Sequence, residues 1–247
     1  MLDLLGLPVA ASAHAGQLDQ ILVITHWLML VLFVGWGAFF TYVLFRFRRS
    51  KSPRADHRGV QGGWSSWVEG GVLAAEVALL AFFSVPAWSN RVDDLPEESK
   101  ATLVRVVAEQ FAWNVHYPGK DGQFGRTDIT LVGPDNPLGL DDADDAARDD
   151  IITDRLNMPV NKPVLVMLSS KDVVHSFGLP QMRVKQDAVP GLVQPVWFTP
   201  TVTGTWEVAC SQLCGLGHYR MKGAYEVMSQ ADYDAWVEEE SALLGVP

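Results

Sequence analysis

The longest charge-free stretch of the chain, Ile21–Phe45, most restricts what this sequence can fold into. About 25 residues without a charged side chain are enough for one helix to cross a bilayer roughly 30 Å thick. A second apolar stretch lies at 67–88 and carries tryptophans near both ends, where membrane interfaces favour them. The sequence therefore predicts two transmembrane helices, at 21–47 and 67–88.

The residues around these stretches predict their orientation. Every Lys and Arg of the first ninety residues lies between Arg46 and Arg58, and loops rich in these residues stay on the cytoplasmic side. We therefore expect loop 48–66 inside and both chain ends outside. Residues 1–20 combine a short apolar run with small residues but lack a basic start, so they are either a cleaved signal segment or a short tail.

Two carboxylates, Glu69 and Glu76, lie within the second stretch. Ionisable groups in a membrane span usually face protein or water, because lipid does not solvate charge. Two helices alone cannot shelter such a group. Glu69 is thus an ordinary carboxylate at headgroup level and Glu76 a buried polar contact to a neighbouring helix, or either of them is part of a proton path. A proton path requires a larger membrane partner.

After a polar linker at 89–100, the pattern changes to short β-rich runs separated by turn residues. This pattern predicts an all-β sandwich or barrel over 101–230, and Ser229 caps a predicted helix in the C-terminal segment 231–247. From residue 90 onward there are 24 Asp and Glu against 13 Lys and Arg. This acidity excludes nucleic acid as an expected partner and favours a basic protein. The densest acidic run, 141–150, is either a solvated loop or part of that steering surface.

Both cysteines of the chain lie in the stretch Cys210-Ser-Gln-Leu-Cys-Gly-Leu-Gly-His-Tyr-Arg-Met221. Thiolate, imidazole and thioether form a soft ligand set that favours copper. Glycines inside the run and extended segments on both sides predict a loop between two strands. His175 is the candidate second imidazole. A mononuclear blue-copper site uses one cysteine, whereas two thiolates can bridge two copper ions and leave no open position for a substrate.

Three other interpretations of the cysteine pair stay open at this point. Cys210 and Cys214 could form a local disulfide or a redox-active dithiol with His218 as an accessory base. A zinc site with two cysteines and two histidines is the third, but it gives no role to Met221.

Nearly the whole chain resembles subunit II of the haem–copper cytochrome c oxidases. The binuclear copper A motif of that family is Cys-x-Glu-x-Cys-x-x-x-His-x-x-Met, with an upstream histidine in an Asp-Val-x-His-Ser-Phe/Trp context. The matching residues are His175, Cys210, Cys214, His218 and Met221. The segment Lys185-Gln-Asp-Ala-Val-Pro-Gly191 also resembles a stretch of the family.

The resemblance implies a fold, a function and partners. The expected fold is a two-helix transmembrane hairpin followed by an all-β cupredoxin-like sandwich, in a bacterial inner membrane with the copper domain on the periplasmic face. Cytochrome c, or a cytochrome c domain, would give electrons to the copper pair, and haem in subunit I would receive them for proton-pumping oxygen reduction. Subunits I and III would be partners. Residue Gln212 would bind copper through its backbone carbonyl.

Three departures from the family pattern bear on function. Gln212 replaces the usual glutamate, and an amide is a poorer ligand for the magnesium ion that this carboxylate holds, which puts magnesium in doubt and indicates a divergent bacterial branch. The tryptophan that accepts electrons in the family falls on Phe111, while Trp113 matches the second tryptophan. The family's Trp-Thr-x-x-Pro pattern is absent from the second span. Counting back from Pro86 aligns Glu69 with the carboxylate that the family associates with the entrance of a proton channel.

Two rival classes of protein fit the sequence less well. A membrane-anchored copper chaperone or thiol reductase would use Cys210 and Cys214 reversibly, but the outer part lacks the alternating helices of a thioredoxin-like scaffold. A quinol oxidase subunit II would have lost the copper, which disagrees with the complete ligand set.

Overall fold

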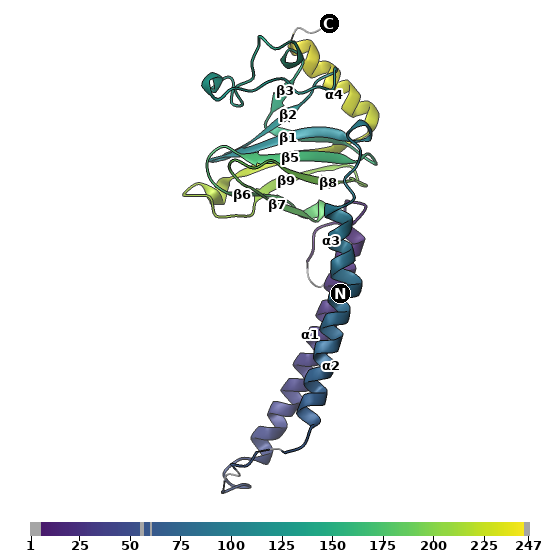
Figure 1. Ribbon diagram of the computed structural model, residues 1–247, viewed down its shortest axis with the longest axis vertical. Coiled ribbons are helices and arrows are strands. Elements are labelled where there is room, and N and C mark those ends of the chain that lie inside the picture. The colour runs from purple at the N-terminus through teal and green to yellow at the C-terminus, as the bar shows by residue number, and fades with distance from the viewer. Residues whose placement is uncertain (1–5, 55–56, 60, 245–247) are drawn as a thin grey trace. The chain divides into compact units, whose positions relative to one another are not determined.

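The computed structural model describes residues 6–54, 57–59 and 61–244, and it contains two compact units (Figure 1). One unit holds Gln17–Asp93 and is helical; the other joins Pro8–Gly16 to the chain from Asp94 onward and is mainly β. Parts of the predicted N-terminal tail (1–5), cytoplasmic loop (55–56 and 60) and C-terminal tail (245–247) lie outside the described residues.

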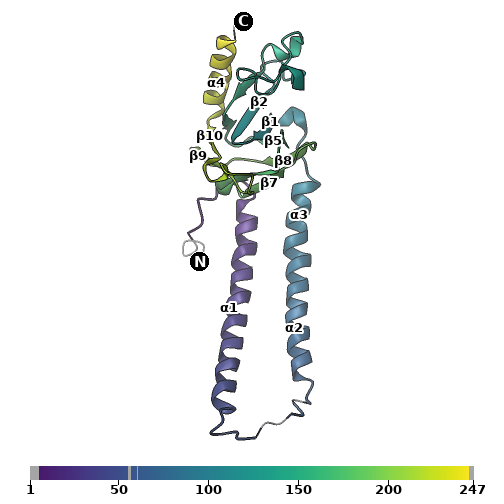
Figure 2. The same cartoon turned by 90° about the vertical axis from the view of Figure 1, so that its left-hand side faces the viewer.

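The helical unit consists of two long apolar helices, α1 and a second one built from three pieces (Figure 2). Helix α1 spans Ala15–Arg46. The second helix consists of α2 (Trp64–Leu79), the π-helical turn η2 (Leu80–Ser84) and α3 (Val85–Val92). The π-helical turn precedes Pro86, which has no backbone N–H to donate to a helical hydrogen bond. Both helices are long and apolar enough to cross a membrane by length and composition.

The β unit is a sandwich of two five-stranded sheets, ordered β3-β2-β1-β5-β8 and β4-β10-β9-β6-β7. Its strands are β1 (Thr102–Glu109), β2 (Ala112–Tyr117), β3 (Ile151–Thr153), β4 (Arg155–Pro159), β5 (Val164–Ser170), β6 (His175–Leu179), β7 (Val184–Ala188), β8 (Gln194–Phe198), β9 (Gly204–Cys210) and β10 (Lys222–Met228). Apolar helices followed by a β-sandwich confirm the predicted fold class.

Strand β1 illustrates how the sequence pattern builds the core. Val104, Val106 and Ala108 are fully buried between the sheets, whereas Leu103 and Arg105, on the opposite face, are half-buried. This alternation follows because successive strand residues point to opposite faces of a sheet. The same buried cluster contains two residues of the predicted metal site, Cys214 and Met221. The site is therefore continuous with the core of the sandwich.

The segment 8–16 is part of the β unit. The Ala11 N–H donates to the Gln181 carbonyl at 2.8 Å, and the Ala11 carbonyl accepts from the Thr201 N–H at 2.8 Å. The Ser12 hydroxyl donates to the Met182 carbonyl at 2.7 Å. Ala11 is fully buried. Residues that the sequence predicted as a tail or signal segment thus pack as an added extended segment of the sandwich.

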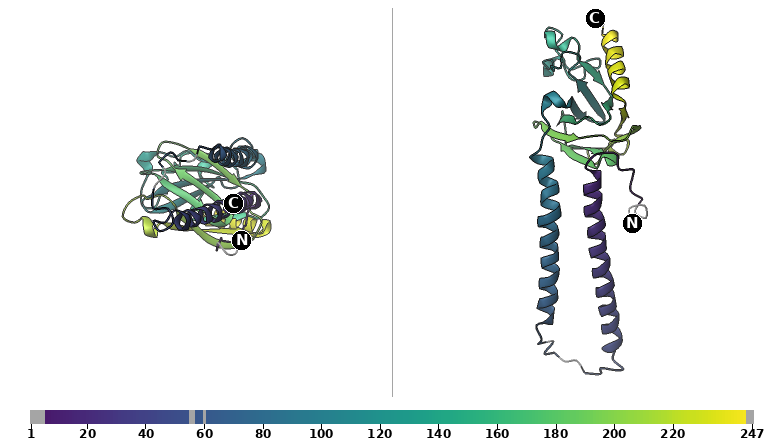
Figure 3. Two further views of the ribbon diagram at one scale, coloured as in Figure 1. Left: turned by 90° about the horizontal axis from the view of Figure 1, so that it is seen from below. Right: turned by 90° about the vertical axis from the view of Figure 1, so that its right-hand side faces the viewer.

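Helix α4 (Gln230–Leu243) covers one side of the sandwich (Figure 3). The Ser229 hydroxyl accepts the Asp232 N–H at 3.1 Å and caps the helix N-terminus. Trp236 meets the buried Tyr117 ring edge-on, with ring centroids 4.9 Å apart. This contact holds the helix against β2.

Candidate metal centre

Strand pairing brings the predicted ligands to one end of the second sheet. His175 is the first residue of β6, and Cys210 is the last residue of β9. The pairing of β6 with β9 places Phe177 opposite Cys210. Met221 directly precedes β10, which pairs with β9 from the register Lys222↔Ala209 onward. A loop and the short turn η7 (His218–Arg220) connect β9 to β10.

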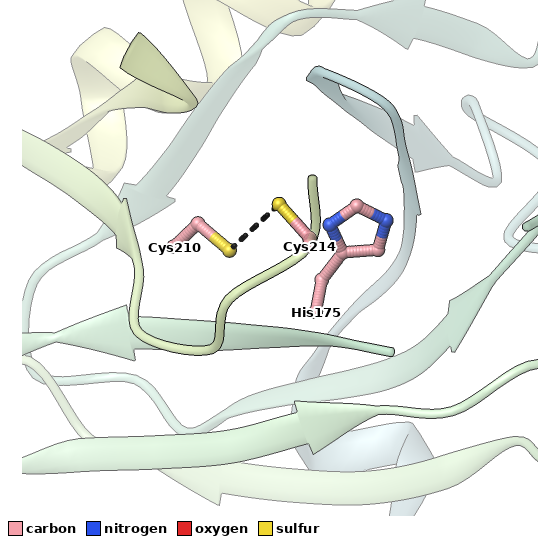
Figure 4. Close-up of side chains that lie close together, drawn as sticks. All are labelled: His175, Cys210 and Cys214. Carbon is pink, nitrogen blue, oxygen red and sulfur yellow. Dashed lines mark hydrogen bonds between the residues drawn. The ribbon is translucent and has the colours of Figure 1, made fainter. Parts of the chain in front are cut away.

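The ligand atoms converge on the sulfur of Cys214. It lies 3.8 Å from the Cys210 Sγ, 3.6 Å from the His218 Nδ1 and 3.7 Å from the Met221 Sδ. The His175 Nδ1 is 3.1 Å from the Met221 Sδ. One ligand atom each from His175, Cys210 and Cys214 fall within 4.8 Å of one another (Figure 4). The structure thus brings together the five ligand side chains that the sequence predicted.

The backbone carbonyl of Gln212 is the sixth predicted ligand, and it also lies at this cluster. It is 3.2 Å from the Cys210 Sγ, while the Gln212 side chain is exposed. A backbone carbonyl is present whichever side chain the residue carries. The replacement of the family's glutamate by glutamine therefore leaves this carbonyl oxygen in place.

The two sulfurs are separate thiols in this structure. Their distance of 3.8 Å is far above the 2.03–2.05 Å of a disulfide. Burial, followed by the neighbouring Cys210 and by Asp172, raises the pKa of the Cys214 thiol to about 11. A thiol with such a pKa is a poor nucleophile at neutral pH, because the thiolate is the reactive form.

Asp172 fixes the orientation of the His175 ring. Its Oδ1 lies 2.9 Å from the His175 Nε2, and the Gln110 N–H donates to its Oδ2 at 2.7 Å. Burial raises the pKa of Asp172, but hydrogen bonds from His175 and from the Gln110 and Val173 N–H groups outweigh it and place that pKa below its ordinary value. A carboxylate beside Nε2 keeps the proton there, so that Nδ1 offers its lone pair to a metal.

The donor set therefore fits copper. Two thiols, two imidazole nitrogens, a thioether and a carbonyl lie within a few ångströms of one another, and His175, Cys214 and Met221 are buried. Soft sulfur and imidazole ligands select copper over magnesium, calcium or manganese.

The two predicted aromatic residues occupy different positions at the centre. Trp113 is 2% exposed and meets the His175 ring edge-on, with centroids 6.3 Å apart. Phe111 is partly exposed and lies against the loop, since a Cβ on Gly217 would come within 2.4 Å of its ring. Glu69 lies on α2 of the helical unit, and its proton role stays a prediction.

Sequence reasoning missed two residues that contact this centre. Asp172 belongs to the Asp-Val-x-His pattern, so its spacing from His175 carried a signal. Gln110 carried none, because its contacts to Asp172 and Cys214 join residues far apart in the chain.

Residues 102–228 match the protein family described as "Cytochrome C oxidase subunit II, periplasmic domain". The alternative cytochrome c oxidase subunit 2 of Bradyrhizobium diazoefficiens is 34% identical over 237 residues, which cover 95% of this chain and 84% of that protein. The chain belongs to the cytochrome c oxidase subunit II family. The resemblance read from the sequence is thereby confirmed, and this chain is a subunit II of a haem–copper oxidase.

Two further relatives show how far this similarity extends. Cytochrome c oxidase subunit 2 of Cereibacter sphaeroides is 32% identical over 237 residues, covering 87% of this chain and 75% of that one. The crystal structure of the periplasmic domain of subunit II of cytochrome oxidase (CoxB) of Bradyrhizobium japonicum aligns with 60% of this chain and 98% of its own, with 28% identity and a TM-score of 0.44.

Proposed function

We propose that this subunit II accepts electrons from cytochrome c, or from a cytochrome c domain, at a binuclear copper A centre and passes them to haem in subunit I. The observation that carries the proposal is the grouping of four other predicted ligand side chains around the Cys214 sulfur. In the proposed site the thiolates of Cys210 and Cys214, together with the imidazoles of His175 and His218, would hold two copper ions. The remaining, weaker ligands are Met221 and the carbonyl of Gln212.

When bound, the copper pair supplies a one-electron relay whose charge is shared between two metals. The protein contributes fixed ligand positions and a dry environment. The Asp172 carboxylate holds the His175 ring, and Trp113 packs edge-on against it and shields it from water. Phe111 covers the loop from the outer side and, with Trp113, is the proposed place where electrons arrive.

The proposed setting is the bacterial plasma membrane, with α1 and the α2–α3 helix spanning it and the copper domain on the periplasmic face. The basic loop between the helices supports this orientation. Subunits I and III are the proposed membrane partners, and Glu69 the proposed proton entrance. Magnesium binding is weakened by the amide of Gln212, so we do not include it in the proposed centre.

The test uses the full chain, purified in detergent and reconstituted with copper under reducing conditions that keep both thiols free. We expect about two coppers per chain and, in the half-oxidised centre, one unpaired electron whose EPR hyperfine structure comes from both nuclei. Cys214→Ser removes the shared sulfur and should abolish the paired signal. Met221→Leu removes only a weak ligand and should keep it in altered form.

Two outcomes would contradict the proposal. A signal from a single copper nucleus would indicate a mononuclear site. A chain that binds no copper, and whose Cys210 and Cys214 cycle between dithiol and disulfide, would belong to the chaperone or thiol-reductase class instead.

A further inference from the structure

Gln110 links the two chain segments that carry the proposed copper ligands. It lies in the turn between β1 and β2, and its two polar ends bond to different segments. Its backbone N–H donates to Asp172 Oδ2 at 2.7 Å, on the side of His175. Its side-chain Nε2 donates to the Cys214 carbonyl at 2.6 Å, on the side of the β9–β10 loop.

The contact with the Cys214 carbonyl acts on the central sulfur of the site. Fixing this carbonyl fixes the peptide plane after Cys214, and with it the direction in which the side chain leaves the backbone. The sulfur of that side chain is within 3.6–3.8 Å of Cys210, His218 and Met221. A change in the peptide orientation would therefore move the sulfur relative to three other ligand atoms at once.

The loop is shaped to accept this contact. Gly215 has a φ of +129°, and a Cβ on it would lie 2.7 Å from the Gln110 Nε2. A Cβ on Gly217 would lie within 2.4 Å of the ring of Phe111, the next residue of the turn. The two glycines thus let the loop backbone lie directly against the turn.

We infer that Gln110 is a positioning residue of the copper centre: it holds the Cys214 peptide and the Asp172–His175 pair in register, so that the ligands from two separate segments meet. This inference rests on the proposed function and extends it to a residue that touches no metal. The amide suits the task because it donates to the Cys214 carbonyl without adding charge beside the Asp172 carboxylate.

Two replacements of similar size separate this role from simple packing. Gln110→Met keeps the volume and removes the donor. Gln110→Glu keeps the shape but turns an acceptor toward the Cys214 carbonyl and adds negative charge near Asp172. If the hydrogen bond positions the loop, Gln110→Glu disturbs the copper centre more than Gln110→Met does. If only side-chain volume matters, Gln110→Glu disturbs it less. Gln123→Met, at an exposed glutamine of the same unit, is the matched control.

The experiment uses the full chain in detergent, loaded with copper. We expect Gln110→Met to release copper to a chelator about tenfold faster than the wild type, the low end of the usual effect for residues that orient metal ligands. The EPR hyperfine couplings should shift, because the Cys214 sulfur leaves its position. Gln110→Glu should exceed both effects, and Gln123→Met should match the wild type. Urea unfolding of the copper-free variants separates these changes from loss of folding.

The possible results test the inference separately from the proposed function on which it rests. A paired copper signal in the wild type, together with unchanged spectra and copper release within twofold of the wild type in both Gln110 variants, would overturn the inference alone. A wild-type chain without the paired signal would overturn the proposed centre and the inference together.

Discussion

A buried pair remote from the metal centre, His116 and Asp150, gives a quantitative test of what holds the β unit together. The His116 Nε2 lies 2.6 Å from Asp150 Oδ2, and both side chains are at most 1% exposed. The same oxygen accepts the buried Gly125 N–H at 2.7 Å. Asp150→Ala therefore leaves two buried donors without their acceptor. Each such donor costs about 1–3 kcal/mol, and breaking a buried pair costs about 3–5 kcal/mol.

We expect Asp150→Ala to reduce the free energy of unfolding by about 4 kcal/mol, which lowers the melting temperature of a unit of this size by roughly 10 °C. Urea unfolding of the copper-free chain, followed by tryptophan fluorescence, measures this loss. Asp142→Ala, at an exposed residue of the same acidic run, should change it by no more than about 0.5 kcal/mol. A loss below about 1 kcal/mol for Asp150→Ala would refute the reasoning, because the two donors would then have found other partners.

Three further predictions concern function. Glu69→Gln should slow proton-coupled oxygen turnover of the assembled oxidase at least several-fold while leaving the copper EPR signal intact; unchanged turnover would exclude Glu69 as a proton entrance. Gln212→Glu should raise the tightly bound magnesium of the assembled complex, measured by metal analysis, since a carboxylate replaces an amide, and an unchanged magnesium content would remove our account of this position. Phe111→Ala should slow electron uptake from reduced cytochrome c, measured by stopped-flow absorbance, with Trp113→Phe as the comparison; equal rates in Phe111→Ala and wild type would move the point of electron arrival away from this ring.

Most of the predicted ligand set could be grouped from the sequence because these residues form a local pattern. Cys210, Cys214, His218 and Met221 recur at short intervals, and their chemistry alone narrows the choice of metal. His175 was harder, since it comes from another strand. Its imidazole made it a candidate ligand, and the family pattern around it supported that assignment before the pairing of β6 with β9 was known.

The acidic run 141–150 shows where composition misleads. Read alone, it predicts a solvated loop or a steering surface. In the structure Asp149 and Asp150 are buried, and they accept backbone N–H groups of residues 120, 121 and 125. Their partners lie about 25 to 34 residues away along the chain, so no local pattern could identify them. At least these two carboxylates are unavailable to a basic partner, and any steering must come from the others.

The packing of residues 8–16 could not be predicted from the sequence for a related reason. Small residues after an apolar run are typical of signal segments, and they are equally suited to packing closely against a sheet. Ala11 is fully buried because its neighbours at Gln181 and Thr201 come close enough for backbone hydrogen bonds. A larger side chain at Ala11 would prevent that approach. A signal segment and a segment packed against a sheet thus favour the same residue types, and only the tertiary contacts distinguish the two.

The position of the predicted ligands at the edge of the core has a consequence for the proposed electron relay. Cys214 and Met221 belong to the same buried cluster as Phe177 and Tyr225, so the packing that stabilises the sandwich also fixes two ligand side chains. His175 is held by Asp172, and the Cys214 peptide by Gln110. Ligands fixed by folding move little when a metal changes its charge, which keeps the reorganisation accompanying each electron small. In the proposed centre these contacts would hold the ligands in place in both oxidation states, whereas a loop without them would relax around each one.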